Sequence, residues 1–263
     1  MPTEPKVVAI IPARWESSRF PGKPLENICG KPMIQWVIDN VRKAQRVSEI
    51  LVATDDKRIF DVVSKFGCRA VMTSKKHVSG TDRIAEVAAD ISCNIVINIQ
   101  GDEPLLPPSN IDLVVQPMLL DSIIQVSTLM TPIRHVDELF DHNVTKTVAD
   151  HNGFALYFSR SPIPFNCDQS RKASFQDQKD ASKPENIKAF KHIGIYAYRK
   201  SFLMQFSQLP NSSLENIEKL EQLRILENGI PIKITETQED SIGVNCPKDI
   251  EKIQQLLKEP VSS

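Results

Sequence analysis

Apolar residues in the first hundred positions fall into two kinds of pattern. Short continuous runs predict buried strands at 7–11, 49–54, 69–73 and 94–100. Between these runs, apolar residues three and four positions apart predict helices over 31–46, 59–66 and 81–91. Strands that alternate with helices of this length are typical of a mostly parallel sheet that is covered by helices on both faces.

The second half of the chain has more strands and fewer helices. We predict strands at 123–133, 145–150, 154–160, 192–198 and 230–237, and helices over 213–227 and 248–258. In the helix 213–227, periodicity directs Leu214, Ile217, Leu220 and Leu223 to the core. Glu221 and Gln222 then fall on the surface of that helix.

A polar stretch at 166–188 is nearly free of apolar residues, so we expect a mobile surface loop there. Whether this loop closes over a site as a lid is left open. The expected fold is a single three-layer α/β unit with a Rossmann-like, mostly parallel sheet. It consists of a core over about 6–120, an inserted mixed α+β subdomain over about 121–212, and a return to the core over about 213–259.

The overall charge and the cysteines narrow the class of protein. The formal net charge of −1 over 263 residues argues against a general nucleic-acid or membrane-surface binder. Five scattered cysteines without a paired pattern indicate reduced thiols. The apolar runs are far shorter than the roughly 20 residues that span a bilayer. We therefore expect a cytoplasmic protein.

The loop after the first strand gathers positive charge in this nearly neutral chain. Arg14, Arg19 and Lys23 follow the strand within ten positions, and Pro21-Gly22 predicts a tight turn between them. Ligands of open α/β sheets bind beyond the carboxyl ends of the strands. From the residues alone, a phosphate-binding loop and an ordinary solvated loop are about equally good interpretations. The Walker pattern does not occur.

Other candidate residues have ordinary structural interpretations when each is taken alone. Asp102 follows the fourth strand in a Gly-Asp-Glu-Pro turn, where turn chemistry is the simpler explanation. Ser79 or Thr81 fits the N-cap of the helix that follows. His192 and Tyr196 share a face of a strand, where a histidine is most often a satisfied core group.

Seven motifs in register resemble those of the 3-deoxy-manno-octulosonate (Kdo) cytidylyltransferases over nearly the whole chain. The first motif is the opening, which consists of Pro12-Ala13-Arg14, Ser17-Ser18-Arg19 and Pro21-Gly22-Lys23-Pro24-Leu25 together with Gly30-Lys31-Pro32-Met33-Ile34. The others are Ala53-Thr54-Asp55, 79–83 (Ser-Gly-Thr-Asp-Arg), 100–104 (Gln-Gly-Asp-Glu-Pro), 155–160 (Ala-Leu-Tyr-Phe-Ser-Arg), 192–196 (His-Ile-Gly-Ile-Tyr) and 220–224 (Leu-Glu-Gln-Leu-Arg).

The resemblance implies transfer of CMP from CTP to Kdo for lipopolysaccharide assembly, with Mg²⁺ as cofactor and a homodimer as the assembly. It assigns CTP binding to Ala13, Arg14, Ser18, Arg19, Lys23, Ser79, Gly80, Thr81 and Gln100. It assigns sugar binding to Gln100, His192, Tyr196, Glu221 and Gln222. Arg14, Lys23 and Asp102 are the expected catalytic residues, with Asp102 as a metal ligand. We add Arg160 as a partner for the sugar carboxylate, because arginine suits bidentate contact.

One position departs from the family pattern. The relatives carry an aspartate as a second metal ligand where this chain has Asn245. An amide oxygen is a poorer partner for Mg²⁺ than a carboxylate. We favour weaker metal binding with retained activity; Asp240 as a substitute ligand and a catalytically impaired binding protein are the alternatives.

The acceptor sugar also has alternatives. The 8-amino analogue of Kdo and a sialic acid are related acid sugars that the residues do not distinguish from Kdo. A glycosyltransferase of similar architecture fits less well, because the cations of the first loop suit a free triphosphate.

Overall fold

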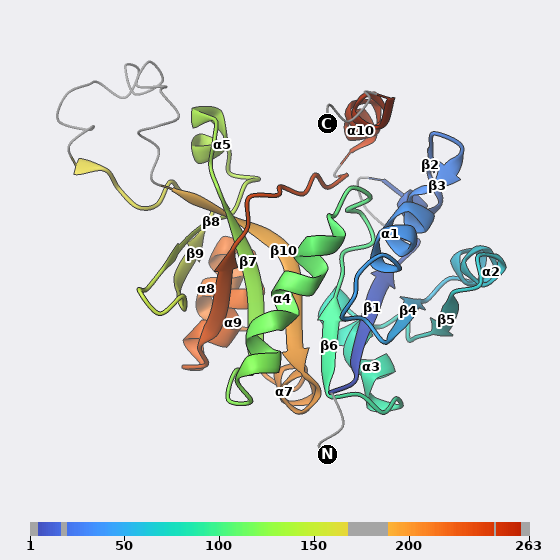
Figure 1. Cartoon of the computed structure of the whole chain (residues 1–263), viewed down its shortest axis with the longest axis horizontal. Coiled ribbons are helices and arrows are strands. Elements are labelled where there is room, and N and C mark those ends of the chain that lie inside the picture. Colours follow the sequence, from blue (N-terminus) through green and yellow to red (C-terminus); the bar gives the residue numbers. More distant parts are fainter. Residues whose placement is uncertain (1–4, 17–19, 168–188, 245, 259–263) are drawn as a thin grey trace.

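A single twisted sheet runs through the molecule and carries both halves of the chain (Figure 1). The computed structural model describes residues 5–16, 20–167, 189–244 and 246–258. Within these ranges the sheet has nine strands, seven of them in the order β11-β7-β10-β6-β1-β4-β5. β8 pairs with β10 and β9 pairs with β8, so the strands of the second half extend the central sheet.

The first half forms the parallel part of this sheet. Its strands are β1 (Val7–Ala13), β4 (Glu49–Thr54), β5 (Arg69–Met72) and β6 (Ile95–Asn98), and all neighbouring pairs are parallel. Its helices are α1 (Met33–Val41), α2 (Lys57–Lys65), α3 (Gly80–Ala89) and α4 (Pro108–Leu120). The predicted alternation of strands and helices is confirmed.

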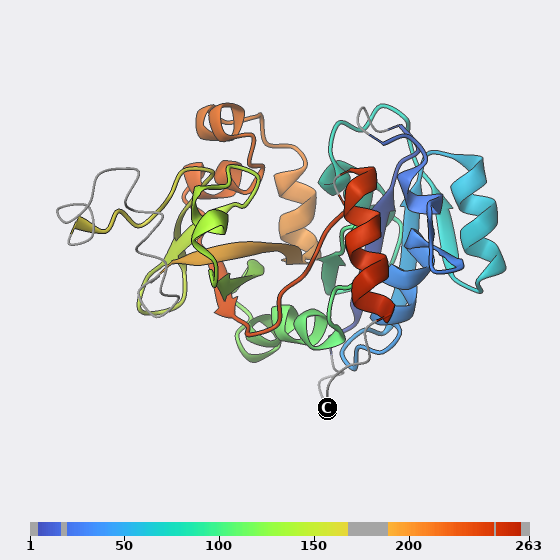
Figure 2. The ribbon, with the colours of Figure 1, turned by 90° about the horizontal axis from the view of Figure 1, so that it is seen from above.

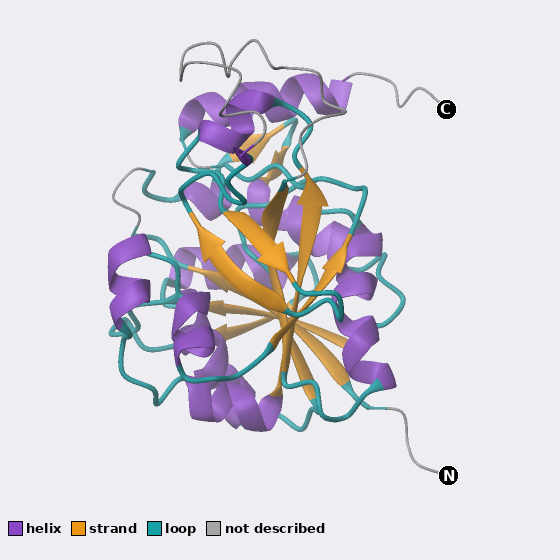
Figure 3. Ribbon diagram, turned by 90° about the vertical axis from the view of Figure 1, so that its left-hand side faces the viewer, coloured by secondary structure: helices purple, strands orange, loops and turns teal. Residues whose placement is uncertain are grey.

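The apolar residues of β1 show why three layers form. Val7, Ala9 and Ile11 pack into the cluster beneath α1, α2 and α4, whereas Val8 and Ile10 pack into the cluster beneath α3. Successive side chains of a strand point to opposite faces, so a fully apolar strand needs a cover on both sides. Helices accordingly lie on both faces of the sheet (Figure 3).

The second half adds two reversed strands. Its strands are β7 (Val126–Pro132), β8 (Lys146–Ala149), β9 (Ala155–Ser159), β10 (Phe190–Arg199) and β11 (Ile232–Glu236). β10 runs antiparallel to both β6 and β7, whereas β11 is parallel to β7. β9 is antiparallel to β8 and is the second reversed strand. Seven of the nine described strands thus share one direction, so the sheet is mostly parallel, as predicted, and β10 joins the two halves.

Several helices differ from the sequence prediction. α4, α5 (Val136–Phe140) and α7 (Lys200–Phe206) were not predicted, and α1 ends at Val41 instead of continuing to position 46. In α4 the prolines obscured the pattern: Pro108 begins the helix, where the missing N–H costs nothing, and Pro117 lies inside it.

The predicted helix 213–227 is wrong in one important respect, because it is broken in the middle. α8 (Ser213–Glu218) ends at Lys219, which adopts the left-handed conformation with φ 55° and ψ 44°, and α9 (Gln222–Glu227) starts in a new direction. Ile217 is 76% exposed instead of facing the core, and Gln222 is only 8% exposed instead of lying on the surface. Periodicity fails here because it assumes one uninterrupted axis.

The last helix returns to the first half of the molecule. α10 (Pro247–Lys258) places Ile250 and Ile253 against Ile28 and Met33, with Val244 in the same cluster. Ile28 belongs to a short hairpin of β2 (Asn27–Ile28) and β3 (Lys31–Pro32), which follows the 3-10 turn η1 (Lys23–Leu25). Figure 2 shows α10 beside these first elements, far from α9. No helix in the described ranges is both long enough and apolar enough to cross a bilayer.

The break at Lys219 can be tested by substitution. A left-handed residue tolerates glycine and disfavours a β-branched side chain, so Lys219→Val should lower the free energy of unfolding by about 1 kcal/mol or more, and Lys219→Gly should not. Urea denaturation measures both. In a continuous helix the order would reverse, because glycine costs about 1 kcal/mol in a helix interior.

Candidate active site

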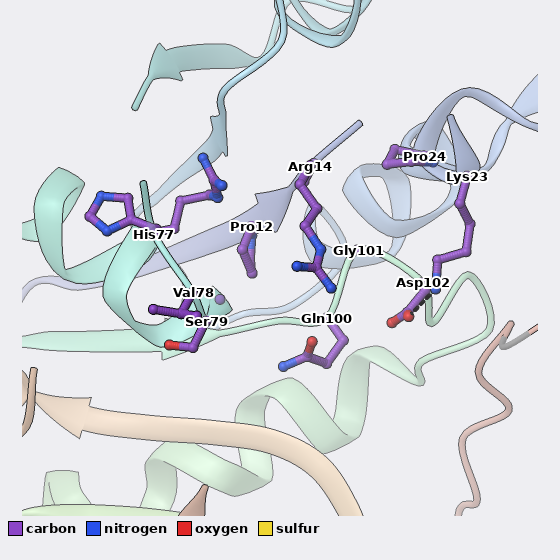
Figure 4. A pocket seen from close by; sticks show the side chains of 13 residues that line it. Pro12, Arg14, Lys23, Pro24, His77, Val78, Ser79, Gln100, Gly101 and Asp102 are labelled. Atoms are coloured by element: carbon purple, nitrogen blue, oxygen red, sulfur yellow. Dashed lines mark hydrogen bonds and ion pairs between the residues drawn. The ribbon is translucent and has the colours of Figure 1, made fainter. Parts of the chain in front are cut away.

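A pocket of about 300 Å³ opens where the loops after β1 and β6 meet the start of α3 (Figure 4). The carboxyl ends of parallel strands share one edge of a sheet, which brings these distant loops together. The pocket is lined by Pro12, Ala13, Arg14, Lys23, Pro24, His77, Val78, Ser79, Gly80, Arg83, Gln100, Gly101 and Asp102. Arg14 and Lys23 extend from one side toward Gln100 and Asp102 (Figure 4). Seven of the nine residues predicted to bind CTP are thus described, and all of these except Thr81 line the pocket.

Lys23 connects three parts of the chain. Its ammonium group forms a hydrogen-bonded ion pair with the carboxylate of Asp102 and donates to the Val244 carbonyl at 2.9 Å. The Val244 N–H in turn donates to the Asp102 carbonyl at 2.8 Å. These three contacts among Lys23, Asp102 and Val244 hold the turn after β6 against the segment that leads into α10. They also place Val244, the residue before Asn245, beside Asp102. Asn245 itself lies outside the described residues, as do Ser18, Arg19 and nearly all of the polar stretch 166–188.

Two glycines allow the pocket walls to approach each other. A Cβ at Gly101 would lie 2.9 Å from the Pro12 carbonyl oxygen, and one at Gly80 would lie 3.2 Å from the Pro12 ring. The first distance is shorter than a carbon–oxygen contact permits. Any side chain at 101 would therefore push the turn that carries Asp102 away from the end of β1.

The start of α3 is fixed by its own cap and by Arg83. The Ser79 hydroxyl accepts from the Asp82 N–H at 3.1 Å, so the predicted N-cap is Ser79. Arg83 is 3% exposed and donates to the Asp55 carboxylate at 2.7 Å and to the Thr73 hydroxyl at 2.5 Å. These bonds secure the pocket-lining segment 77–80 to the ends of β4 and β5.

A second polar cluster begins at Thr81, directly behind Gly80. The Thr81 hydroxyl donates to the Glu221 carboxylate at 2.5 Å, and the Asn98 amide contacts Thr81 at 3.5 Å. Burial raises the pKa of Glu221, and burial also raises that of Tyr196 well above its usual range. In the part of the chain that the structure describes, the Tyr196 hydroxyl, one Glu221 oxygen and the Asn98 side-chain oxygen are buried without a hydrogen-bond partner.

Buried polar atoms in folded proteins are nearly always hydrogen-bonded. Two of the three unpartnered atoms belong to residues that contact Thr81, and Tyr196 lies opposite Asn98 in the register of β10 and β6. Together these atoms could bind hydroxyl groups of a ligand. Glu221 reaches this site because the break at Lys219 turns α9 inward.

His192 lies on the same side of β10 as Tyr196, as predicted, with the two ring centres 5.2 Å apart. Burial lowers the pKa of His192 to about 3, so the imidazole is neutral at pH 7. Its Nε2 lies 2.9 Å from the Thr128 hydroxyl, which itself donates to the Ile195 carbonyl at 2.7 Å. Thr128 must then accept from Nε2–H, which leaves Nδ1 as an acceptor.

The Arg160 guanidinium is held by the backbone. Its Nε donates to the Glu218 carbonyl at 2.7 Å, and its terminal nitrogens donate to His142 at 2.8 Å and to Lys219 at 3.4 Å. Arg160 thus stabilises the turn between α8 and α9. Arg160 is not among the residues that line the pocket described above.

Several residues that line the pocket were given no role from the sequence, namely Pro12, Pro24, His77, Val78, Arg83 and Gly101. Arg83 closes a motif that was recognised, and His77 and Val78 immediately precede it. Glu103, next to Asp102, accepts from the Ser241 hydroxyl at 2.7 Å, and burial raises its pKa to about 7.

Comparisons with known proteins agree with this geometry. The cytidylyltransferase family model matches residues 8–240. The 3-deoxy-manno-octulosonate cytidylyltransferases of Geotalea uraniireducens and Geobacter sulfurreducens are 49% and 48% identical to this chain, over 96% of its length and 99% of theirs. The chain belongs to the 3-deoxy-manno-octulosonate cytidylyltransferase family.

Solved structures extend the likeness to three dimensions. A CMP:2-keto-3-deoxy-manno-octonic acid synthetase complexed with CTP superimposes with a TM-score of 0.86 at 41% identity, covering 96% of this chain and 98% of that one. A putative glucose-1-phosphate thymidylyltransferase from Bacillus anthracis gives 0.65 at 14% identity over 98% of this chain and 97% of its own, which shows a shared fold alone.

The residues at the pocket fit a magnesium ion that shares its ligands with phosphate. The described residues contain no group of three or more metal-binding side chains. Mg²⁺ does not need one, since it is commonly bound by one or two carboxylates, waters and substrate phosphates. Asp102 supplies such a carboxylate and already holds a cationic group, the ammonium of Lys23. Asp240 is less suited as a substitute ligand, because it is not among the residues that line the pocket.

The low pKa of His192 predicts a pH dependence of stability. The pKa is about 6.5 in the unfolded chain and about 3 in the fold, so the unfolded state gains the proton first and stability falls as pH drops below about 6.5. When the pH is lowered from 7 to 4.5, the free energy of unfolding should fall in both proteins. The fall should be about 1–2 kcal/mol smaller in His192→Gln than in the original protein, a range that allows for partial exposure of His192. Urea titrations at both pH values measure it.

His151→Gln, at an exposed histidine, serves as the control and should follow the original protein. Equal pH slopes for His192→Gln and the original protein would contradict a buried neutral imidazole.

Proposed function

We propose that this protein transfers CMP from CTP to Kdo, giving CMP-Kdo and pyrophosphate, and so activates the sugar for lipopolysaccharide assembly. The observation that carries the proposal is the pocket with Arg14, Lys23 and Asp102, in a chain 41% identical over 96% of its length to a synthetase solved with CTP. The relatives described above share the Kdo name, so nothing favours 8-amino-Kdo or a sialic acid as the acceptor.

Arg14 and Lys23, with Arg19, bind the triphosphate. Two cations at one side of the pocket offset the roughly four negative charges of a nucleoside triphosphate and stabilise the charge that develops on the leaving pyrophosphate. The segment Ser79-Gly80-Thr81 and Gln100 border the cytidine, and Gly80 allows close approach to the backbone. The anomeric hydroxyl of Kdo attacks the α-phosphorus in line, its oxygen–phosphorus bond forms, and the bond to the β-phosphate breaks.

The polar cluster behind Gly80 orients the sugar. The unpartnered Tyr196 hydroxyl and Glu221 oxygen supply groups that sugar hydroxyls can complete, and the neutral His192 offers its Nδ1 as an acceptor. Gln100 and Gln222 border the same region in this proposal. Orientation matters because alignment of the two substrates can supply much of the rate.

Asp102 would hold Mg²⁺, with Asn245 as a weaker second ligand. When bound there, Mg²⁺ would polarise the α-phosphate and lower the pKa of the attacking hydroxyl. This chemistry makes a side-chain general base unnecessary, and we assign none. A homodimer and a cytoplasmic location complete the proposal.

The test of the reaction is pyrophosphate release from CTP, with and without Kdo, across a Mg²⁺ titration. Release should require all three components and should be accompanied by CMP-Kdo, detected by mass spectrometry. Asp102→Asn, which keeps the size and removes the charge, should lower the rate by at least about 100-fold. Binding of CTP without any release at saturating Mg²⁺ and Kdo would point to a binding protein that has lost its chemistry.

Asn245→Asp tests the departure from the family pattern. A carboxylate is a better ligand for Mg²⁺ than an amide, so the substitution should lower the Mg²⁺ concentration that gives half the maximal rate, by about threefold or more. Asp240→Asn is the matched control: Asp240 does not line the pocket, so its substitution should leave that concentration unchanged. An unchanged Mg²⁺ dependence in Asn245→Asp would remove position 245 from the metal site.

A further inference from the structure

Trp15 occupies a position that none of the assignments above explains. It lies one residue after Arg14, at the beginning of the loop that ends with Gly22 and Lys23. Its indole is partly buried against the core cluster beneath α1 and α2. Two of the cations proposed to bind the triphosphate, Arg14 and Lys23, are therefore the immediate neighbours of Trp15 and Gly22.

Trp15 and Gly22 are in direct contact through both backbone and side chain. The Gly22 N–H donates to the Trp15 carbonyl at 3.0 Å. A Cβ at Gly22 would lie 3.0 Å from the indole ring, and Gly22 has a φ of +73°. Position 22 is thus restricted to glycine both by its backbone conformation and by the indole ring. The contacts between Trp15 and Gly22 hold the two ends of the loop together.

Arg58, at the start of α2, is stacked on the same ring. Its guanidinium carbon lies 3.3 Å from the centre of the indole ring. The guanidinium is fixed in its plane by Asp56, which accepts from Nε at 2.8 Å and from a terminal nitrogen at 2.7 Å. Asp56 also caps α2 by accepting from the Arg58 N–H at 2.9 Å, so the stack is anchored to the end of β4.

We infer that Trp15, held by Arg58, is a positioning residue that sets the separation of Arg14 and Lys23 for the triphosphate. Arg58 acts through the indole ring and needs no contact with the nucleotide. Its side chain is 57% exposed, so an ion pair with a distant phosphate would be largely screened, whereas a planar stack on a fixed ring is not lost to solvent. The inference rests on the proposed function for the identity of the ligand.

The test compares CTP affinity in Trp15→Ala, Arg58→Ala and the double variant, by calorimetry with Mg²⁺ and without Kdo. Each single substitution should weaken CTP binding about fivefold, the effect of losing one exposed cation–π stack. The double variant should be no weaker than Trp15→Ala, because the arginine has no effect once the ring is gone. The KM for Kdo and the thermal midpoint of Arg58→Ala should stay near those of the original protein.

Conservative variants and a neighbour separate stacking from charge. Trp15→Phe keeps a ring and should restore most of the affinity, whereas Arg58→Lys keeps the charge but loses the planar stack and should remain weak. Lys57→Ala is the control, since this exposed neighbour of Arg58 pairs with Asp61 at 2.7 Å; it should bind CTP as the original protein does.

Three outcomes would overturn the inference. These are unchanged CTP affinity in either single variant, additive effects in the double variant, and full recovery in Arg58→Lys. Additivity or recovery by lysine would mean that Arg58 attracts the nucleotide directly. The original protein binding CTP without forming CMP-Kdo would contradict the proposed reaction. The CTP affinities of the variants would still decide whether Trp15 has the inferred role.

Discussion

The contacts of one ammonium group hold together the part of this protein that we propose to be catalytic. Lys23 joins residues that lie 79 and 221 positions away in the sequence, through Asp102 and the Val244 carbonyl. A charged group in a partly buried place is stabilised only when several polar partners converge on it. Here those partners come from the turn after β6 and from the segment before α10. The apolar cluster of Ile28, Met33 and Val244 with α10 then fixes that segment against the first half of the chain.

This arrangement depends on how closely the loops can approach the sheet. Gly101 lets the turn that carries Asp102 lie on the Pro12 carbonyl, and Gly22 lets the end of the first loop lie on the Trp15 ring. At each point a side chain would separate groups that must stay within hydrogen-bond distance. The reversed strand β10 adds the other constraint, because it crosses from the nucleotide side to the second half and presents His192 and Tyr196 together.

The sequence predicts what depends on local periodicity or on a recognised motif, and little else. β4 is found at the predicted positions, because a continuous apolar run allows one interpretation. α4 was missed because its prolines hid a regular helix. The burial of Glu221 was not predictable from spacing, since it follows from a left-handed Lys219 that no pattern reveals. The partners of Arg160 are equally non-local. Its guanidinium is bound by three backbone carbonyls from two turns that are distant in the sequence, whereas the prediction paired it with the sugar carboxylate from its chemistry alone.

The two halves of the proposed site differ in how their polar groups are satisfied before substrate arrives. On the nucleotide side two of the three N–H groups of Lys23 are bound by Asp102 and the Val244 carbonyl, which keeps the pocket in shape and leaves one N–H for a triphosphate. On the sugar side the Tyr196 hydroxyl and one Glu221 oxygen have no protein partner within the described residues. A buried polar group without a hydrogen-bond partner destabilises the protein by roughly 1–3 kcal/mol, unless a water molecule is ordered beside it to supply the missing bond. A ligand that completes these bonds recovers that free energy, whereas an analogue lacking the matching hydroxyl does not. The sugar side of the proposed site, with its unpartnered polar groups, should therefore discriminate between acceptor sugars. The nucleotide side, where Lys23 is already bound, should hold the nucleotide in position.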